Sequence, residues 1–273
     1  MIRIGASTLL YFKRPLSEGV ALLKKSGFRH IELFCDEPHA NPFQISKREI
    51  QKILRLKEKH GLQFSIHTPC FDLNPASINP RIREEVFEHY RESLDLARKV
   101  GANAVVVHLG NRSDMKLRQD ESLTWTIQLL KRVLKIAENY RILLLAENTD
   151  YGDLSMVKDE EQYRKVIYKF HSPFMKAILD TGHANLNGIP MVRLIKRLGR
   201  RLGSLHISDN QGDKDAHLPP GQGSINFKLI FNALDNIQFN GTVILEIYDE
   251  ASPSEALDQS LNYIQKLSPS CEM

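Results

Sequence analysis

The chain has 273 residues, of which 42% are hydrophobic and 26% are charged, with a formal net charge of +4. This is enough apolar material for a large core. The odd number of cysteines, without a CxxC spacing, argues against a disulfide framework and favours a reducing, cytoplasmic setting. No apolar run approaches the roughly 20 residues that span a bilayer, and the N-terminus lacks the pattern of a signal peptide. We therefore expect no membrane partner.

Short apolar segments alternate with longer amphipathic ones along the whole chain. Several of the short segments, such as AVVVH and RILLLAE, are continuous apolar runs, which is typical of parallel strands covered on both faces. The predicted strands are residues 2–6, 30–34, 63–67, 104–108, 142–147, 176–180, 204–207 and 242–247.

The longer segments have helix signals. Ser46 and Glu49 form a capping box before a helix that Gly61 ends, and Pro80 and Gly101 bracket the next helix. The predicted helices are residues 16–26, 47–60, 80–100, 121–139, 160–170, 191–202, 226–234 and 253–267. Eight strands alternating with eight helices predict an α/β fold, a (β/α)8 TIM barrel, as a single domain over residues 1–273.

The functional residues of such a barrel lie at the carboxyl ends of the strands and in the loops that follow. Nine residues of the types that bind metals (His, Asp and Glu) occupy those positions here, and they include five of the ten histidines. They are His67, His108, Glu147, Asp180, His183, His206, Asp215, His217 and Glu246. Buried carboxylates and imidazoles that converge need a compensating cation. Mixed nitrogen and oxygen ligands suit zinc, manganese, iron or cobalt better than calcium.

Each of these residues taken alone is more often structural, and only their coincidence on one face favours a metal site. Glu32 is interpreted as structural, as a helix cap or a partner of a lysine, because its strand supplies no histidine to that face. Cys35 and Cys70 follow strands but lack the partners of a nucleophile, and are interpreted as bystander thiols. The glycines of residues 219–223 are expected to shape a tight loop rather than to cradle a phosphate.

The chain resembles the xylose isomerase-like TIM-barrel superfamily, which also contains endonuclease IV. The resemblance covers essentially the whole chain and is carried by HTPCFDLNPAS (67–77), VVVHLG (105–110), LLAENT (144–149), ILDTGHANL (178–186), LHISDNQGDKDAHLPPGQG (205–223) and ILEIY (244–248). It implies a divalent metal, zinc or manganese, with one to three ions per chain.

The two branches of the superfamily imply different uses of the site. The epimerase and isomerase branch implies one metal held by Glu147, Asp180, His206 and Glu246, with Glu147 and Glu246 also acting as the catalytic acid and base. The endonuclease IV branch implies a trinuclear zinc cluster held by all nine residues, which cleaves DNA at abasic sites.

Charge placement favours the first branch. The loops of the functional face are rich in Asp and Glu, whereas Lys and Arg concentrate in residues 47–60 and 193–203, and a DNA backbone requires cations near the cleavage site. The arginine that epimerases place a few residues after the strand-7 histidine is absent from HISDNQGDK, which argues against a specific ketose 3-epimerase. The sequence therefore predicts a metal-dependent sugar or sugar-phosphate isomerase or epimerase with a small polyhydroxylated substrate. The alternatives are a zinc phosphodiesterase with a nucleic-acid partner, and a non-catalytic barrel that binds metal or sugar.

Overall fold

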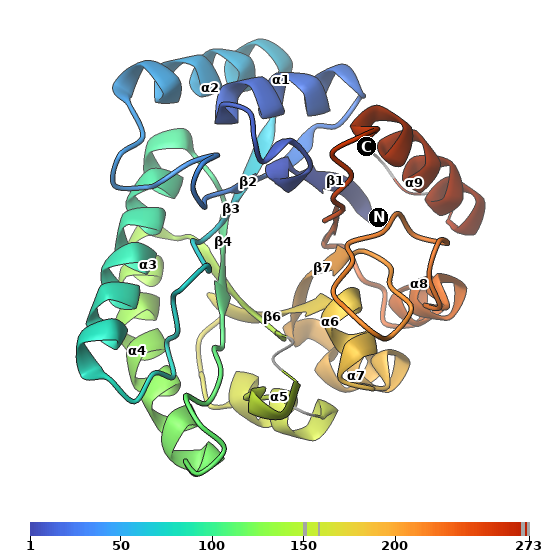
Figure 1. The fold of residues 1–273 in the computed structure, drawn as a ribbon. Coiled ribbons are helices and arrows are strands. Elements are labelled where there is room, and N and C mark those ends of the chain that lie inside the picture. Colours follow the sequence, from blue (N-terminus) through green and yellow to red (C-terminus); the bar gives the residue numbers. More distant parts are fainter. Residues whose placement is uncertain (150–151, 158, 269–270, 272–273) are drawn as a thin grey trace.

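Eight parallel strands close into a barrel in which each strand pairs with its neighbours in the sequence and β1 pairs with β8 (Figure 1). The computed structural model describes residues 1–149, 152–157, 159–268 and 271. The strands are β1 (Arg3–Ser7), β2 (His30–Phe34), β3 (Gln63–His67), β4 (Ala104–His108), β5 (Leu143–Glu147), β6 (Met175–Asp180), β7 (Leu202–Ile207) and β8 (Thr242–Leu245). The predicted (β/α)8 barrel is confirmed.

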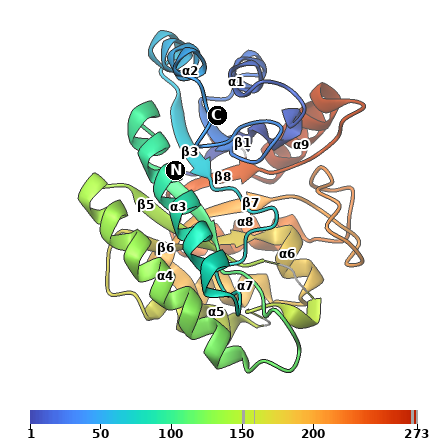
Figure 2. The same cartoon turned by 60° about the vertical axis from the view of Figure 1, so that its left-hand side comes forward.

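Helices surround the barrel (Figures 1 and 2). They are α1 (Leu16–Lys25), α2 (Lys47–His60), α3 (Pro80–Val100), α4 (Gln119–Tyr140), α5 (Glu160–Tyr168), α6 (Thr181–Leu186), α7 (Met191–Leu198), α8 (Phe227–Asn236) and α9 (Pro253–Leu267). Three short 3₁₀ helices are η1 (Thr8–Tyr11), η2 (Gly152–Leu154) and η3 (Gly199–Arg201). No helix among the described residues is both long and apolar enough to cross a bilayer.

The helix signals in the sequence have direct structural counterparts. The hydroxyl of Ser46 accepts the backbone N–H of Glu49, and Gly61 ends α2 with φ 64°. Gly101 ends α3 in the same left-handed conformation, with φ 65°. Left-handed backbone at a helix C-terminus favours glycine because it has no Cβ to clash. These caps explain why α2 and α3 have the bounds that the sequence predicts.

Two helical features differ from the prediction. The six-residue α6 follows β6 directly, because the carboxylate of Asp180 accepts the backbone N–H of His183 and so caps a helix within the expected loop. Helix α7 ends at Leu198, four residues early, because Gly199 has φ 48° and ψ −122° and leaves the helical conformation. Strand β7 consequently begins at Leu202.

Side chains along each strand alternate between the helix-covered outside and the interior of the barrel. Val105 and Val107 belong to the main core under the helices, whereas Val106 packs with Leu145 and Ile178 in a separate cluster that this alternation places inside the barrel. Continued to the carboxyl ends of the strands, the same alternation reaches polar residues. The inward positions there are His67, His108, Glu147, Asp180, His206 and Glu246.

Candidate metal centre

A cavity of about 530 Å³ opens at the carboxyl ends of the strands. Seven of the nine predicted ligands line it, and the other two, Asp180 and His206, are fully buried. The lining ligands are His67, His108, Glu147, His183, Asp215, His217 and Glu246. The structure therefore brings all nine predicted residues to one end of the barrel.

Four of these residues form a compact buried group: Glu147, Asp180, His206 and Glu246. One ligand atom from each lies within 4.8 Å of all the others. His206 Nδ1 is 3.1 Å from Glu147 Oε1 and 2.9 Å from Glu246 Oε2. The strand register contributes directly, because Asp180 of β6 pairs with His206 of β7. This is the ligand set that the sequence predicts for a single metal.

This group sets three carboxylates around one imidazole. Burial raises the pKa of Asp180 to about 7, with the charge of His183 opposing the shift and those of Glu147 and Glu246 adding to it. Burial also acts to raise the pKa of Glu246, but the nearby charge of His206 outweighs it and holds this pKa at about 2. Asp180 Oδ2 and Glu147 Oε2 are buried without a hydrogen-bond partner among the described residues. Oxygen and nitrogen donors in this condition fit a divalent cation.

His67 and His108 lie on the other side of Glu147. Glu147 Oε1 faces His206, whereas Glu147 Oε2 is 3.3 Å from His67 Nε2 and 3.2 Å from His108 Nε2. Burial lowers the pKa of His67, but hydrogen bonding and charge from Glu147 outweigh it and raise the pKa to about 9. Burial lowers the pKa of His108, and the charge of His67 adds to the shift. Glu147 is thus placed to bridge two groups of ligands.

The remaining three residues form a group at the rim. Asp215 Oδ2 is 3.3 Å from His183 Nε2 and 3.0 Å from His217 Nε2. The Nδ1 atoms of the two rings face backbone carbonyls, of Asn148 at 3.0 Å and of Glu246 at 2.7 Å. An Nδ1–H that donates to a carbonyl leaves a lone pair on Nε2 in a neutral ring, and this lone pair would face the carboxylate oxygen of Asp215. The contact is favourable only if Nε2 is protonated or a cation lies between Nε2 and Asp215. His217 also has φ 45°, a strained conformation of the kind that clusters at functional sites.

Glu32 has different partners from those predicted for it. Its carboxylate is buried, with Oε1 2.9 Å from His206 Nε2 and Oε2 accepting a hydrogen bond from Ser65 Oγ. It therefore contacts a predicted metal ligand rather than a lysine or a helix end. A carboxylate on the outer nitrogen of a ligating histidine fixes the orientation of the ring, and here it turns Nδ1 toward Glu147 and Glu246. The signal in the sequence was the inward position of Glu32, two residues before the end of its strand.

Replacing Glu32 with alanine should lower metal affinity by about 10- to 100-fold, the usual effect of removing an outer partner of a metal ligand. Competition with a chromophoric chelator would measure it. Glu160→Gln is the matched control, because Glu160 is equally buried but pairs with Arg193 outside the site. Equal affinities for the two variants would contradict this role for Glu32.

Cys70 lies beside two of the predicted metal ligands, His67 and His108. Asp36 holds its loop by accepting the backbone N–H of Cys70 at 2.9 Å and that of Phe71 at 3.3 Å, and it also accepts the Cys70 thiol at 3.3 Å. Burial and the charge of Asp36 raise the pKa of this thiol well above its usual value. The metal-free thiol is therefore protonated, as expected of a residue that is not a nucleophile. Cys35 is fully buried in the core.

The glycine-containing loop 219–223 closes on a carboxylate of its own chain. Asp209 is fully buried and accepts the backbone N–H groups of Gly221 at 2.9 Å and Ile225 at 3.1 Å. These amides are thus engaged within the protein, in accord with the predicted structural role of the loop.

One wall of the cavity is aromatic. The ring of Phe71 lies 5.9 Å from that of Phe12 and 6.0 Å from that of Phe34, and Tyr248 also lines the cavity. Among the described residues that line the cavity, none is lysine or arginine. The cavity therefore offers metal-binding groups on its floor and an uncharged apolar surface beside them.

A sequence model of the xylose isomerase-like TIM barrel family matches residues 20–267. The chain belongs to this family.

Proteins that are similar in sequence to this chain have different names. An uncharacterized protein of Methanocaldococcus jannaschii is 27% identical over 271 residues, covering 97% of this chain and 91% of the relative. Fructoselysine 3-epimerase of Escherichia coli O157:H7 is 19% identical, covering 90% of both chains. A probable endonuclease 4 of Mycobacterium leprae is 28% identical, covering 64% of this chain and 69% of the relative.

Two solved structures show the same fold. A D-tagatose 3-epimerase-like protein superposes with a TM-score of 0.86 at 24% identity, covering 98% of both chains. The IOLI protein with a bound zinc atom superposes with a TM-score of 0.81 at 16% identity, covering 97% of both chains.

Proposed function

We propose that this protein is a divalent-metal-dependent epimerase or isomerase of a small, unphosphorylated sugar-like substrate. The observation that carries the proposal is that Glu147 and Glu246 line the cavity and each has a carboxylate oxygen within 4.8 Å of a ligand atom of buried Asp180 and of buried His206. Relatives and structural neighbours named as sugar 3-epimerases support it.

The residues of the site would have distinct roles in this reaction. Glu147, Asp180, His206 and Glu246 would hold the metal, and Glu32 would keep the ring of His206 in position. When bound, the cation would polarise the carbonyl and hydroxyl oxygens of the substrate and so stabilise negative charge on them. Glu147 and Glu246 would remove a proton from the carbon beside the carbonyl and return one to it, because carboxylates at the cavity wall can serve as base and acid.

The rest of the cavity supports an uncharged substrate. Phosphate is usually held by arginine, lysine or free backbone amides, and none of the described lining residues is an arginine or a lysine. The aromatic wall of Phe12, Phe34 and Phe71 can instead pack against the C–H face of a sugar and exclude water. We therefore favour a free sugar or a sugar conjugate over a sugar phosphate.

The zinc phosphodiesterase is the second candidate, because all nine residues that such a cluster requires lie at one end of the barrel. The same lack of lysine and arginine in the described lining argues against it, since a DNA backbone is usually neutralised by several of these side chains.

The test is proton exchange. Metal-loaded protein would be incubated in D₂O with D-fructose, D-tagatose and D-psicose, and deuterium at the carbon beside the carbonyl would be followed by NMR. We expect exchange and formation of the epimer with at least one sugar. Cleavage of a duplex with an abasic site, without exchange in any of the sugars, would overturn the proposal in favour of the phosphodiesterase.

A further inference from the structure

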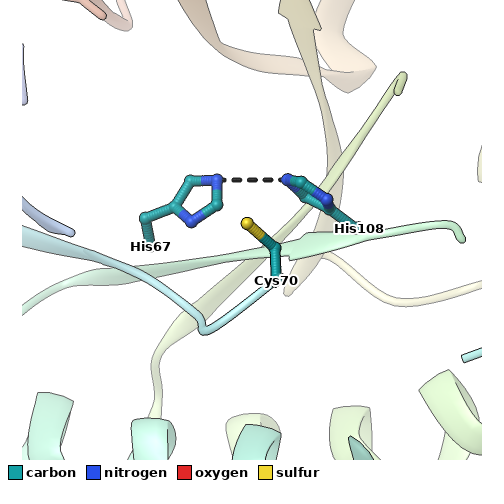
Figure 3. A group of neighbouring side chains, drawn as sticks. All are labelled: His67, Cys70 and His108. Atoms are coloured by element: carbon teal, nitrogen blue, oxygen red, sulfur yellow. Dashed lines mark hydrogen bonds between the residues drawn. The ribbon is translucent and has the colours of Figure 1, made fainter. Parts of the chain in front are cut away.

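The sulfur of Cys70 faces two of the predicted metal ligands. Cys70 Sγ and one ring nitrogen each of His67 and His108 all lie within 4.8 Å of one another. Figure 3 shows the sulfur pointing toward the space between the two imidazole rings. The thiol reaches this position because the loop after β3 turns back, held by the hydrogen bonds to Asp36.

Three other atoms already have the spacing that a tetrahedral ion imposes. Nitrogen and oxygen ligands bonded to zinc at about 2.0–2.1 Å lie roughly 3.3 Å from one another. His67 Nε2 and His108 Nε2 are 3.2 Å apart, and Glu147 Oε2 is 3.3 Å and 3.2 Å from them. Glu147 is completely buried, and its Oε2 has no hydrogen-bond partner among the described residues. This orphaned oxygen is an observation independent of the cysteine, and it points to a cation at the same place.

We propose that Cys70 is a metal ligand, whose thiolate joins His67, His108 and the outer oxygen of Glu147 in a second, zinc-selective site beside the central group. The resemblance to endonuclease IV implies only the two histidines and the glutamate at this place, and the thiolate is an additional ligand. A sulfur ligand favours zinc over manganese or magnesium. Four protein ligands also make the site closed, which is the form of a structural zinc and leaves no open position for an activated water.

Binding exchanges a proton for the metal without a change of oxidation state. In the metal-free protein the thiol donates to Asp36 Oδ2 at 3.3 Å. As the S–Zn bond forms, the S–H bond breaks and its proton passes through Asp36 to solvent. A divalent ion deprotonates a coordinating thiol outright, so a thiol that is protonated in the metal-free chain is no obstacle.

Cobalt reports on this site directly, because a thiolate bound to Co²⁺ gives a charge-transfer absorption in the near ultraviolet. Metal-free protein would be titrated with Co²⁺, and each variant would be checked for folding by circular dichroism. We expect the absorption in the wild type and in Cys271→Ser, a control cysteine at the C-terminal end of the chain, and its loss in Cys70→Ser. Zinc affinity at the second site should fall by at least about tenfold in Cys70→Ser.

The absence of this absorption in the wild type, or its persistence in Cys70→Ser, would overturn the proposal. Glu246→Gln serves as a second variant, because it alters the central group alone and should keep the thiolate absorption. The two sites share Glu147, but the result is separable from the proposed function, because the cobalt absorption reports on the thiolate of Cys70 without any sugar and proton exchange is measured in a separate experiment.

Discussion

Replacing Glu246 with glutamine is expected to lower the rate of proton exchange by about 10²- to 10⁴-fold, the usual contribution of a general acid or base. The amide has nearly the shape of the carboxylate but cannot accept the substrate proton, and it removes a negative charge from beside His206, whose Nδ1 is 2.9 Å from Glu246 Oε2. Deuterium incorporation into the most active sugar of the panel, at saturating metal, would measure the loss.

Glu250→Gln is the matched control for this experiment. Glu250 lies only four residues further along the chain, but it is exposed and pairs with Lys13 instead of facing the cavity floor. Its replacement should leave exchange within about twofold of the wild type, as expected for an exposed ion pair. If Glu246→Gln retained full activity, the assignment of this residue as acid or base would be wrong.

Replacing Glu147 with glutamine should destabilise the metal-free protein near neutral pH by about 3–5 kcal/mol, the usual cost of breaking a buried ion pair. Glu147 is completely buried, and its carboxylate contacts four imidazoles. These belong to His67, His108, His183 and His206. Without the carboxylate, the positive charge of His67, His183 and His206, whose pKa values are raised, would be left inside the barrel. Chemical denaturation of metal-free protein would give the difference in the free energy of unfolding.

The pH dependence of this loss follows from the pKa of His67, which is raised to about 9 in the folded chain. An unfolded histidine titrates near about 6.5. The stabilisation that His67 gains from Glu147 is therefore complete below pH of about 6.5 and is lost as the pH rises through about 9. The deficit of Glu147→Gln should accordingly be larger at about pH 6 than at about pH 9.5.

Leu145→Ala is a control for Glu147→Gln that removes buried apolar atoms and no charge. Leu145 lies in the apolar cluster inside the barrel, so its truncation should cost about 2–5 kcal/mol through the cavity that it leaves. That cost should be the same at both pH values. A deficit of Glu147→Gln that did not change with pH would show that packing, rather than the pairing of charges, accounts for the importance of Glu147.

The barrel could be predicted from the sequence because its signals are local. Apolar runs such as AVVVH mark strands, and Gly61 and Gly101 end helices wherever the rest of the chain lies. The short α6 escaped prediction because its cap, Asp180, is also a predicted metal ligand at the end of a strand. Asp180 both caps α6 and is a predicted metal ligand, and only its role as a ligand was predicted from the sequence.

The set of nine predicted metal ligands could also be found from short segments of sequence, since the carboxyl ends of all strands in a parallel barrel meet at one face. How these residues divide into groups depended on the tertiary structure. The register of β4 with β5 sets His108 beside Glu147, and that of β6 with β7 sets Asp180 beside His206. Only closure of the barrel places Glu147 between the two groups, with one oxygen facing each.

The sequence by itself determined the fold and the end of the barrel at which the polar residues gather, because strand periodicity and strand ends are properties of short segments. The tertiary structure alone decided which residues Glu32 and Cys70 contact. Glu32 meets His206 through the barrel interior, from strands that are not neighbours in the sheet. Cys70 reaches His67 and His108 only because Asp36 folds its loop back over the cavity. Contacts of this kind depend on how distant segments close around a shared space, and no periodicity within one segment encodes them.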